Sequence, residues 1–97
     1  MKKTVLAAAM FATVALTTTA MASGEDAYTN FGCAGCHGAN GISPSEAYPN
    51  LAGQKASYTA KQLRDFQSGD RVDPTMQAMA AMAAGQEDAI AEYISGL

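Results

Sequence analysis

Two cysteines and a histidine fall within five consecutive residues, Cys33-Ala34-Gly35-Cys36-His37, and this cluster constrains the fold more than any other feature. The chain has no other cysteine or histidine. On a helical turn, residues three and four positions apart share one face. The two thiols and the imidazole are therefore expected to point the same way, while the small Ala34 and Gly35 leave the backbone of the turn accessible.

The Cys-x-x-Cys-His spacing is typical of covalent attachment of a c-type haem, with two thiols on the porphyrin edge and the imidazole on the iron. A thioredoxin-like redox pair is the first alternative, but it requires a preceding strand and a βαβ context, which the sequence lacks. A structural zinc site needs four ligands, more Cys and His than the chain contains. A disulfide across two residues closes too short a loop to stabilise much. The sequence therefore predicts one haem bound through Cys33, Cys36 and His37.

The N-terminal segment has the layout of a secretory signal peptide. A basic start, Met1-Lys2-Lys3, precedes an apolar run, and Ala20-Met21-Ala22 offers a small-x-small cleavage site. The run is short for a membrane span, which needs about 20 mostly apolar residues, so an uncleaved anchor is the weaker alternative. We expect residues 1–22 to be removed on export. Residues 23–97 are then expected to form one periplasmic domain without stable membrane insertion.

The predicted mature segment is acidic and small. It holds all nine acids of the chain, and its four cations are Lys55, Lys61, Arg64 and Arg71, so its formal charge is −5. This balance argues against nucleic acid or an anionic membrane surface as a partner. A domain of this size builds a marginal core and usually needs a disulfide, a metal or a cofactor to hold it. A haem at its centre meets that need.

The pattern of residues 23–97 predicts an all-α domain, because no run alternates apolar and polar residues and Val and Ile are scarce. Helices are predicted over residues 25–32, 57–67 and 86–95, with a short helical turn over 76–82. Ser57 is the expected N-cap of the middle helix, and Ser68-Gly69 its expected end. Residues 38–56 form a long loop, which a domain this small is expected to keep only if the loop wraps a ligand.

The far side of the iron needs a second ligand, and His37 is the only histidine. Methionine is the other common axial ligand of carrier cytochromes. Met76, Met79 and Met82 are spaced three residues apart, a pattern that is also typical of a flexible core stripe. Met76 is the favoured ligand because it follows the Asp73-Pro74 turn, and Met79 is the fallback.

The order of these motifs resembles that of the class I c-type cytochromes, in particular the short bacterial periplasmic members and single domains of their dihaem relatives. The matching segments are CAGCHGANG (33–41), PNLAGQ (49–54), YTAKQL (58–63) with Phe66, GDR (69–71), Met76 and IAEYI (90–94). The likeness covers nearly all of residues 25–97. It implies an all-α fold of three to five short helices, with long loops wrapped around one haem.

The resemblance also implies roles for single residues. Cys33 and Cys36 match the thioether cysteines, and His37 matches the proximal ligand. Met76 matches the distal ligand, Leu51 a residue packed on the haem, and Pro49 the proline whose carbonyl accepts a hydrogen bond from the ligating histidine. From spacing alone, Pro49 is equally well an ordinary loop proline. The family further implies that the first and last helices cross near the haem edge, with Tyr93 as the aromatic of the last helix.

Six-coordinate iron without an open position implies a one-electron carrier, and the sequence shows no acid–base pair or nucleophile typical of an enzyme. Its expected partners are a quinol-oxidising complex of the cytochrome bc type and a terminal oxidase, peroxidase or nitrogen-oxide reductase. Small transient contacts and a monomer or weak dimer are expected. Two alternatives stay open: the haem subunit of a periplasmic dehydrogenase, favoured by an exposed apolar patch beside the haem, and a five-coordinate sensor that binds a small gas.

Overall fold

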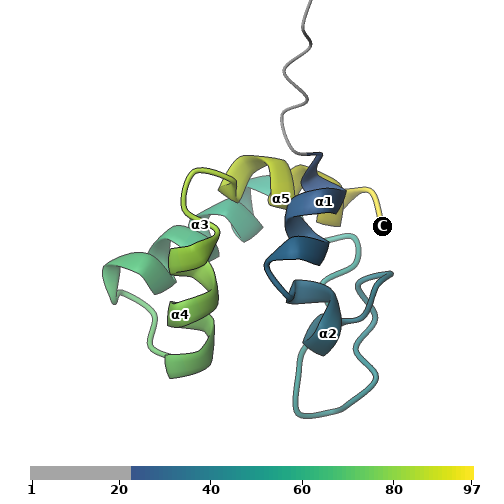
Figure 1. Cartoon of the computed structure of the whole chain (residues 1–97), viewed down its shortest axis with the longest axis horizontal. Helices are drawn as coiled ribbons and strands as arrows, with labels where there is room; N and C mark the ends of the chain where they lie inside the picture. The colour runs from purple at the N-terminus through teal and green to yellow at the C-terminus, as the bar shows by residue number, and fades with distance from the viewer. Residues whose placement is uncertain (1–22) are drawn as a thin grey trace, which may run out of the picture.

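The computed structural model describes residues 23–97, and in this range the chain forms five helices and no strand (Figure 1). They are α1 (Gly24–Asn30), α2 (Cys33–His37), α3 (Ala56–Ser68), α4 (Pro74–Met82) and α5 (Glu87–Ser95). The prediction of an all-α domain is confirmed. The predicted signal peptide, residues 1–22, lies outside the described residues. Within the described range, no helix has the length and apolar character needed to cross a membrane.

Helices α1 and α5 cross closely, as the resemblance implied, and they lie together at the top of the molecule in Figure 1. Gly24 makes the crossing possible, because a Cβ built at this glycine would collide with the backbone carbonyl oxygen of Ala89 on α5 and lie 2.7 Å from the Cβ of Tyr93. One turn later on α1, the ring of Tyr28 packs against that of Tyr93 with centroids 5.4 Å apart and planes tilted by 55°. Tilted contacts of this kind are favourable between aromatic rings.

Helix α3 begins earlier than predicted, and the proposed N-cap at Ser57 is wrong. The cap position is Lys55, and no side chain caps the helix. The reason is that the chain has already turned at Lys55, whose carbonyl accepts from the backbone N–H of Thr59 at 3.1 Å. The Thr59 hydroxyl also bonds the Gln54 side chain at 3.0 Å. The end of the helix is as predicted, at Gly69 in the left-handed conformation (φ 83°).

A small hydrophobic core forms where α1, α3, α4 and α5 pack together. Its buried members are Ala27, Tyr28, Leu63, Phe66, Ala80, Ala83, Ile90 and Ile94. The core residues from α4 and from the turn after it are both alanines, Ala80 and Ala83. This part of the chain therefore packs close to the other helices but removes little apolar area from water. Such a core is modest, as expected of a domain organised around a bound group.

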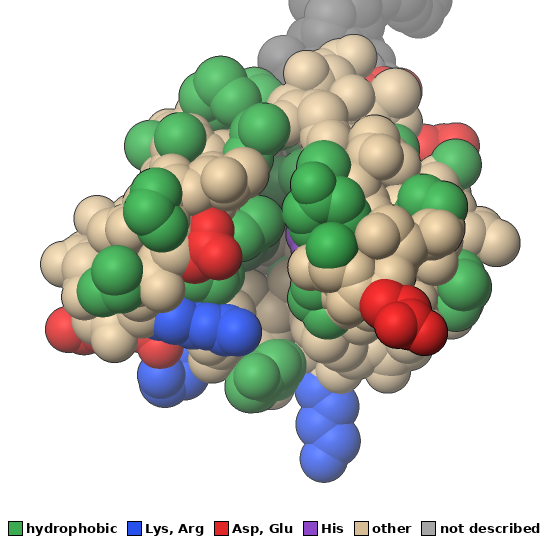
Figure 2. Space-filling view, turned by 90° about the horizontal axis from the view of Figure 1, so that it is seen from below, with side chains coloured by type: hydrophobic (Ala, Val, Ile, Leu, Met, Phe, Trp, Pro, Cys, Tyr) green, Lys and Arg blue, Asp and Glu red, His purple; other side chains and the backbone are tan. Residues whose placement is uncertain are grey.

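The elements stand on two sides of a hollow. In Figure 1, α3 and α4 lie on one side, α2 and the loop of residues 38–55 lie on the other, and α5 joins them above. Figure 2, which looks up from below, shows hydrophobic side chains on both sides of the hollow and the chain's only histidine in its depth. The long loop therefore forms one wall of a concave space.

Candidate haem site

The Cys-x-x-Cys-His motif forms α2, which follows Gly32 in the left-handed conformation. Cys33 and Cys36 are half-buried free thiols at helical spacing i, i+3. Burial, with a smaller contribution from Cys36, raises the pKa of the Cys33 thiol. A Cβ built at Gly35 would meet nothing within 4 Å. The motif therefore presents two neighbouring sulfurs on a turn with open space beside its backbone.

His37 is buried, with 6% of its surface exposed, and its Nδ1 lies 2.8 Å from the carbonyl oxygen of Pro49. Because a carbonyl only accepts, Nδ1 carries the proton and donates, which leaves Nε2 with the lone pair that binds a metal. The Tyr48 ring approaches the imidazole edge-on, with centroids 6.5 Å apart. The orientation and the tautomer of His37 are thus fixed from the side of the loop.

The loop that carries Pro49 is closed at its base. The backbone N–H groups of Leu51 and Ala52 donate to the Gly41 carbonyl at 2.8 and 3.0 Å. Gly41 is buried with φ 74°, a conformation that suits glycine. The Asn50 side chain accepts from the Ser43 N–H at 2.7 Å. These bonds hold the Pro49 carbonyl in place, and Leu51 packs half-buried against the core.

Tyr28 holds the other end of α2, a role that the sequence analysis did not identify. Its hydroxyl donates to the carbonyl of Gly38, the residue after His37, at 2.6 Å. The residue is 1% exposed, and burial, with smaller contributions from the neighbouring Cys33 and Tyr93, raises the pKa of Tyr28 to about 12. The hydroxyl therefore stays protonated and remains a donor. No regular spacing links Tyr28 to the motif, so only the fold shows the contact.

The three methionines lie on or at the end of α4, which begins two residues earlier than the predicted turn. Asp73 caps the helix by accepting from the Met76 N–H at 2.9 Å, and Pro74 occupies the first turn. Met76 is half-buried and packs against the core. Met79 is half-buried, whereas Met82 is 55% exposed. The distal-ligand role of Met76 stays a prediction, and Met82 is the least suited of the three.

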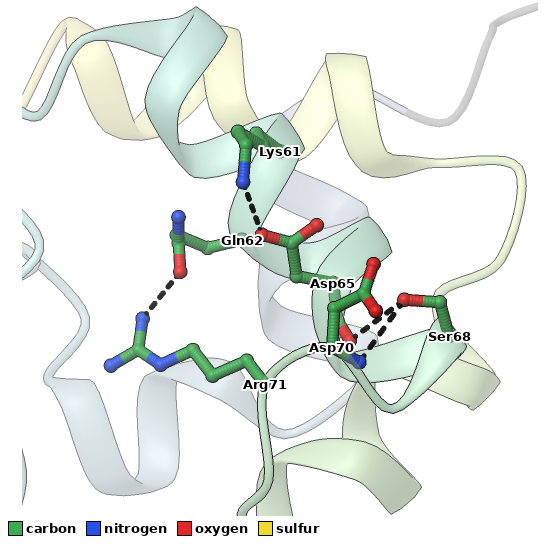
Figure 3. Close-up of polar contacts among 6 residues, drawn as sticks. All are labelled: Lys61, Gln62, Asp65, Ser68, Asp70 and Arg71. Atoms are coloured by element: carbon green, nitrogen blue, oxygen red, sulfur yellow. Dashed lines mark hydrogen bonds and ion pairs between the residues drawn. The ribbon is translucent and has the colours of Figure 1, made fainter.

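The turn that leads from α3 into α4 is held by polar contacts (Figure 3). The Arg71 N–H donates to the Asp65 carbonyl at 3.1 Å, and the Arg71 guanidinium donates to the Gln62 side chain at 2.7 Å. The guanidinium also lies over the Phe66 ring, 4.8 Å from its centre. The start of α4, and with it Met76, is thereby fixed relative to α3.

These residues fit a covalently bound haem. The site offers two thiols one turn apart, an imidazole with one nitrogen held and the other available, and half-buried apolar side chains beside the core, among them Phe31, Leu51 and Met76. Within residues 23–97, no group of three or more His, Cys, Asp or Glu is placed to hold a bare metal ion, so the zinc alternative has no site there. When bound, a haem supplies a reversible one-electron change at its iron.

The fold and the site define a small c-type cytochrome. The family model described as "Cytochrome c" matches residues 21–97, so the chain belongs to the cytochrome c family and carries covalently attached haem c through the Cys-x-x-Cys-His motif.

Individual proteins of known name also resemble this chain. The crystal structure of reduced cytochrome c4 from Pseudomonas stutzeri superposes with a TM-score of 0.67 at 39% identity, over 76% of this chain and 46% of that one. The thiosulfate dehydrogenase electron acceptor of Stutzerimonas stutzeri is 41% identical over 78% of this chain and 39% of its own length. The cytochrome subunit of sulfide dehydrogenase from Chlorobaculum tepidum is 39% identical over 67% of this chain and 59% of that subunit. The chain therefore spans less than half of the first two proteins.

Proposed function

We propose that this electron carrier is periplasmic and uses His37 and Met76 as its two axial ligands. The observation that carries the proposal is the placement of α4. This helix lies across the hollow from α2, and its first turn bears a half-buried methionine that packs on the core (Figure 1). An iron with both axial positions filled exchanges electrons and leaves no position for a substrate.

The carrier is proposed to take electrons from a quinol-oxidising complex of the cytochrome bc type and to pass them to a terminal oxidase or reductase. The net charge of residues 23–97, −5, favours acceptors and donors with a basic contact surface. Encounter with such a partner is expected to slow as ionic strength rises, because salt screens exposed charges beyond about 10 Å at 0.1 M.

Carbon monoxide tests directly whether both axial positions of the iron are occupied. The reduced wild-type protein is expected to keep its visible spectrum under carbon monoxide, since both axial positions are occupied. The Met76→Ala variant is expected to bind carbon monoxide, and the Met79→Ala variant is the matched control, expected to behave as wild type. Binding by the wild-type protein would reject the carrier in favour of the five-coordinate gas sensor.

The names of two relatives favour a second candidate, a haem protein that works with a dehydrogenase. Exposed apolar side chains of the described residues, Ile42, Tyr48 and Val72, offer contact area for a catalytic chain. Size-exclusion chromatography of the protein from its native periplasm separates the two readings. Elution as a small single chain in low salt supports the free carrier, whereas co-elution with a larger chain supports the subunit.

A further inference from the structure

Glu87, the first residue of α5, is the one buried acid among residues 23–97, with 8% of its surface exposed. Both of its carboxylate oxygens are used. Oε1 accepts from the Gln67 side-chain amide at 2.8 Å, and Oε2 accepts from the backbone N–H of Gly85 at 2.9 Å. The same Gln67 nitrogen donates to the Ala80 carbonyl at 2.8 Å. One amide and one carboxylate thus join α3, α4, the turn after α4, and α5.

The start of α5 does not require a buried acid. Asp88 already places an acidic side chain in the same first turn, where it suits the helix dipole, and its carboxylate is exposed. Burial works against ionisation of Glu87, yet its hydrogen bonds with Gln67 and the backbone, and the charge of Arg64, lower its pKa overall. A charged, buried carboxylate with a hydrogen bond at each oxygen points to a role beyond starting the helix.

The element that gains most from this network is α4. Its only buried residue is Ala80, so apolar packing holds it weakly. The Ala80 carbonyl belongs to the last turn of α4, where carbonyls have no partner within the helix, and Gln67 supplies that partner. Ala80 lies four residues after Met76, on the same helical face. Fixing Ala80 therefore fixes the face of α4 that carries Met76.

We propose that Gln67 and Glu87 are positioning residues that hold α4 against α3 and so keep Met76 on the iron. This inference rests on the proposed function, in which Met76 is the distal ligand. The Asp73 cap and the Arg71 contacts secure the beginning of α4, and the Gln67–Glu87 network secures its end.

Imidazole competes with methionine for the sixth position of oxidised iron. The dissociation constant of imidazole therefore reports how readily Met76 on α4 is displaced from the iron. The experiment titrates oxidised holoprotein with imidazole at neutral pH and follows the change in the haem absorption spectrum, which also reports binding in the reference variant Met76→Ala, where the methionine–iron band is expected to be absent. The variants are Gln67→Leu, which removes both donated bonds, and Glu87→Gln, which keeps the shape but not the charge. Asp88→Asn is the matched control, because it removes an acid from the same helical turn. It also removes the 3.0 Å ion pair between Asp88 on α5 and Arg64 on α3, which does not involve α4.

Gln67→Leu and Glu87→Gln are expected to bind imidazole about tenfold more tightly than wild type, since each loses a hydrogen bond to a charged or buried group. Asp88→Asn is expected to match wild type. Suppose that Met76→Ala tightens imidazole binding but Gln67→Leu and Glu87→Gln do not, even when these two variants unfold at lower denaturant concentration. The network then stabilises the fold without positioning Met76, and this inference is wrong. If Met76→Ala itself leaves imidazole binding unchanged, the proposed ligand is wrong and the inference falls with it.

Discussion

Tyr28→Phe isolates one hydrogen bond at the haem motif. The substitution keeps the ring, and with it the packing against Tyr93, but removes the hydroxyl that donates to the Gly38 carbonyl at 2.6 Å. Tyr28 is 1% exposed and Gly38 is half-buried, so the Gly38 carbonyl beside His37 loses its side-chain partner in a partly buried setting. The loss of a short, partly buried hydrogen bond costs about 1–1.5 kcal/mol of stability.

Tyr93→Phe is the matched control. Its hydroxyl lies 3.5 Å from the Ala39 carbonyl, one residue further along the chain, and this contact is exposed. A bond at that distance is near the limit of a real hydrogen bond, and water can replace it. The control is therefore expected to lose less than about 0.5 kcal/mol. The two variants remove the same atom from the two members of one ring pair, so their difference reports the Tyr28 bond.

Guanidinium unfolding of the oxidised holoprotein, followed by far-ultraviolet circular dichroism, measures both free energies. The free energy of unfolding is expected to fall by about 1 kcal/mol more in Tyr28→Phe than in Tyr93→Phe, with unchanged slopes. Equal losses in the two variants, or a larger loss in Tyr93→Phe, would show that the Tyr28 hydroxyl does not hold the end of α2.

Three further outcomes are expected. Gly24→Ala should cost about 1–3 kcal/mol because the new Cβ would collide with the carbonyl oxygen of Ala89 and lie 2.7 Å from the Cβ of Tyr93. Gly96→Ala, whose nearest neighbour is 3.7 Å away, should stay close to wild type in the same unfolding assay. Asp73→Ala should lower stability by about 1 kcal/mol and Asp73→Asn by less, since asparagine also caps helices; thermal melts measure both. Alkaline pH should destabilise the wild type: the pKa of Tyr28 is raised from 10.0 to about 12, so the unfolded chain releases the proton first, and the contribution present below pH 10 is lost as pH rises towards 12. Tyr28→Phe should flatten the stability curve in that window, and an unchanged curve would contradict the assignment.

The structural features that depend on local residue spacing could be predicted from the sequence. The motif at Cys33 to His37 predicts a helical turn with its chemistry, and α2 covers those five residues. Gly69 signals a helix end through its left-handed conformation. Asp73 and Pro74 carry an equally local signal for a helix start, but the prediction treated them as a turn before residue 76, whereas α4 begins at Pro74. Each signal works because a few neighbouring residues decide the outcome without help from the rest of the chain.

The remaining features depend on contacts between distant segments. The start of α3 is an exception, because two local signals compete there: Ser57 has the chemistry of an N-cap, but bonds from Thr59 to Lys55 and Gln54, four and five residues earlier, start the helix before it. Gly24 reads as an unremarkable glycine until α5 lies against it. Glu87 reads as an acid in a first turn, and only the packing of α3 and α4 makes it buried. Side chains whose partners are 10 or more residues away give no periodic signal.

The methionine–iron band of the oxidised holoprotein tests the central claim most directly. The purified wild-type protein is expected to show this weak band at the red end of its spectrum, the Met76→Ala variant to lose it and the Met79→Ala variant to keep it. A band that survives in Met76→Ala, or that is missing from the wild-type protein, would contradict the assignment of His37 and Met76 as the two ligands.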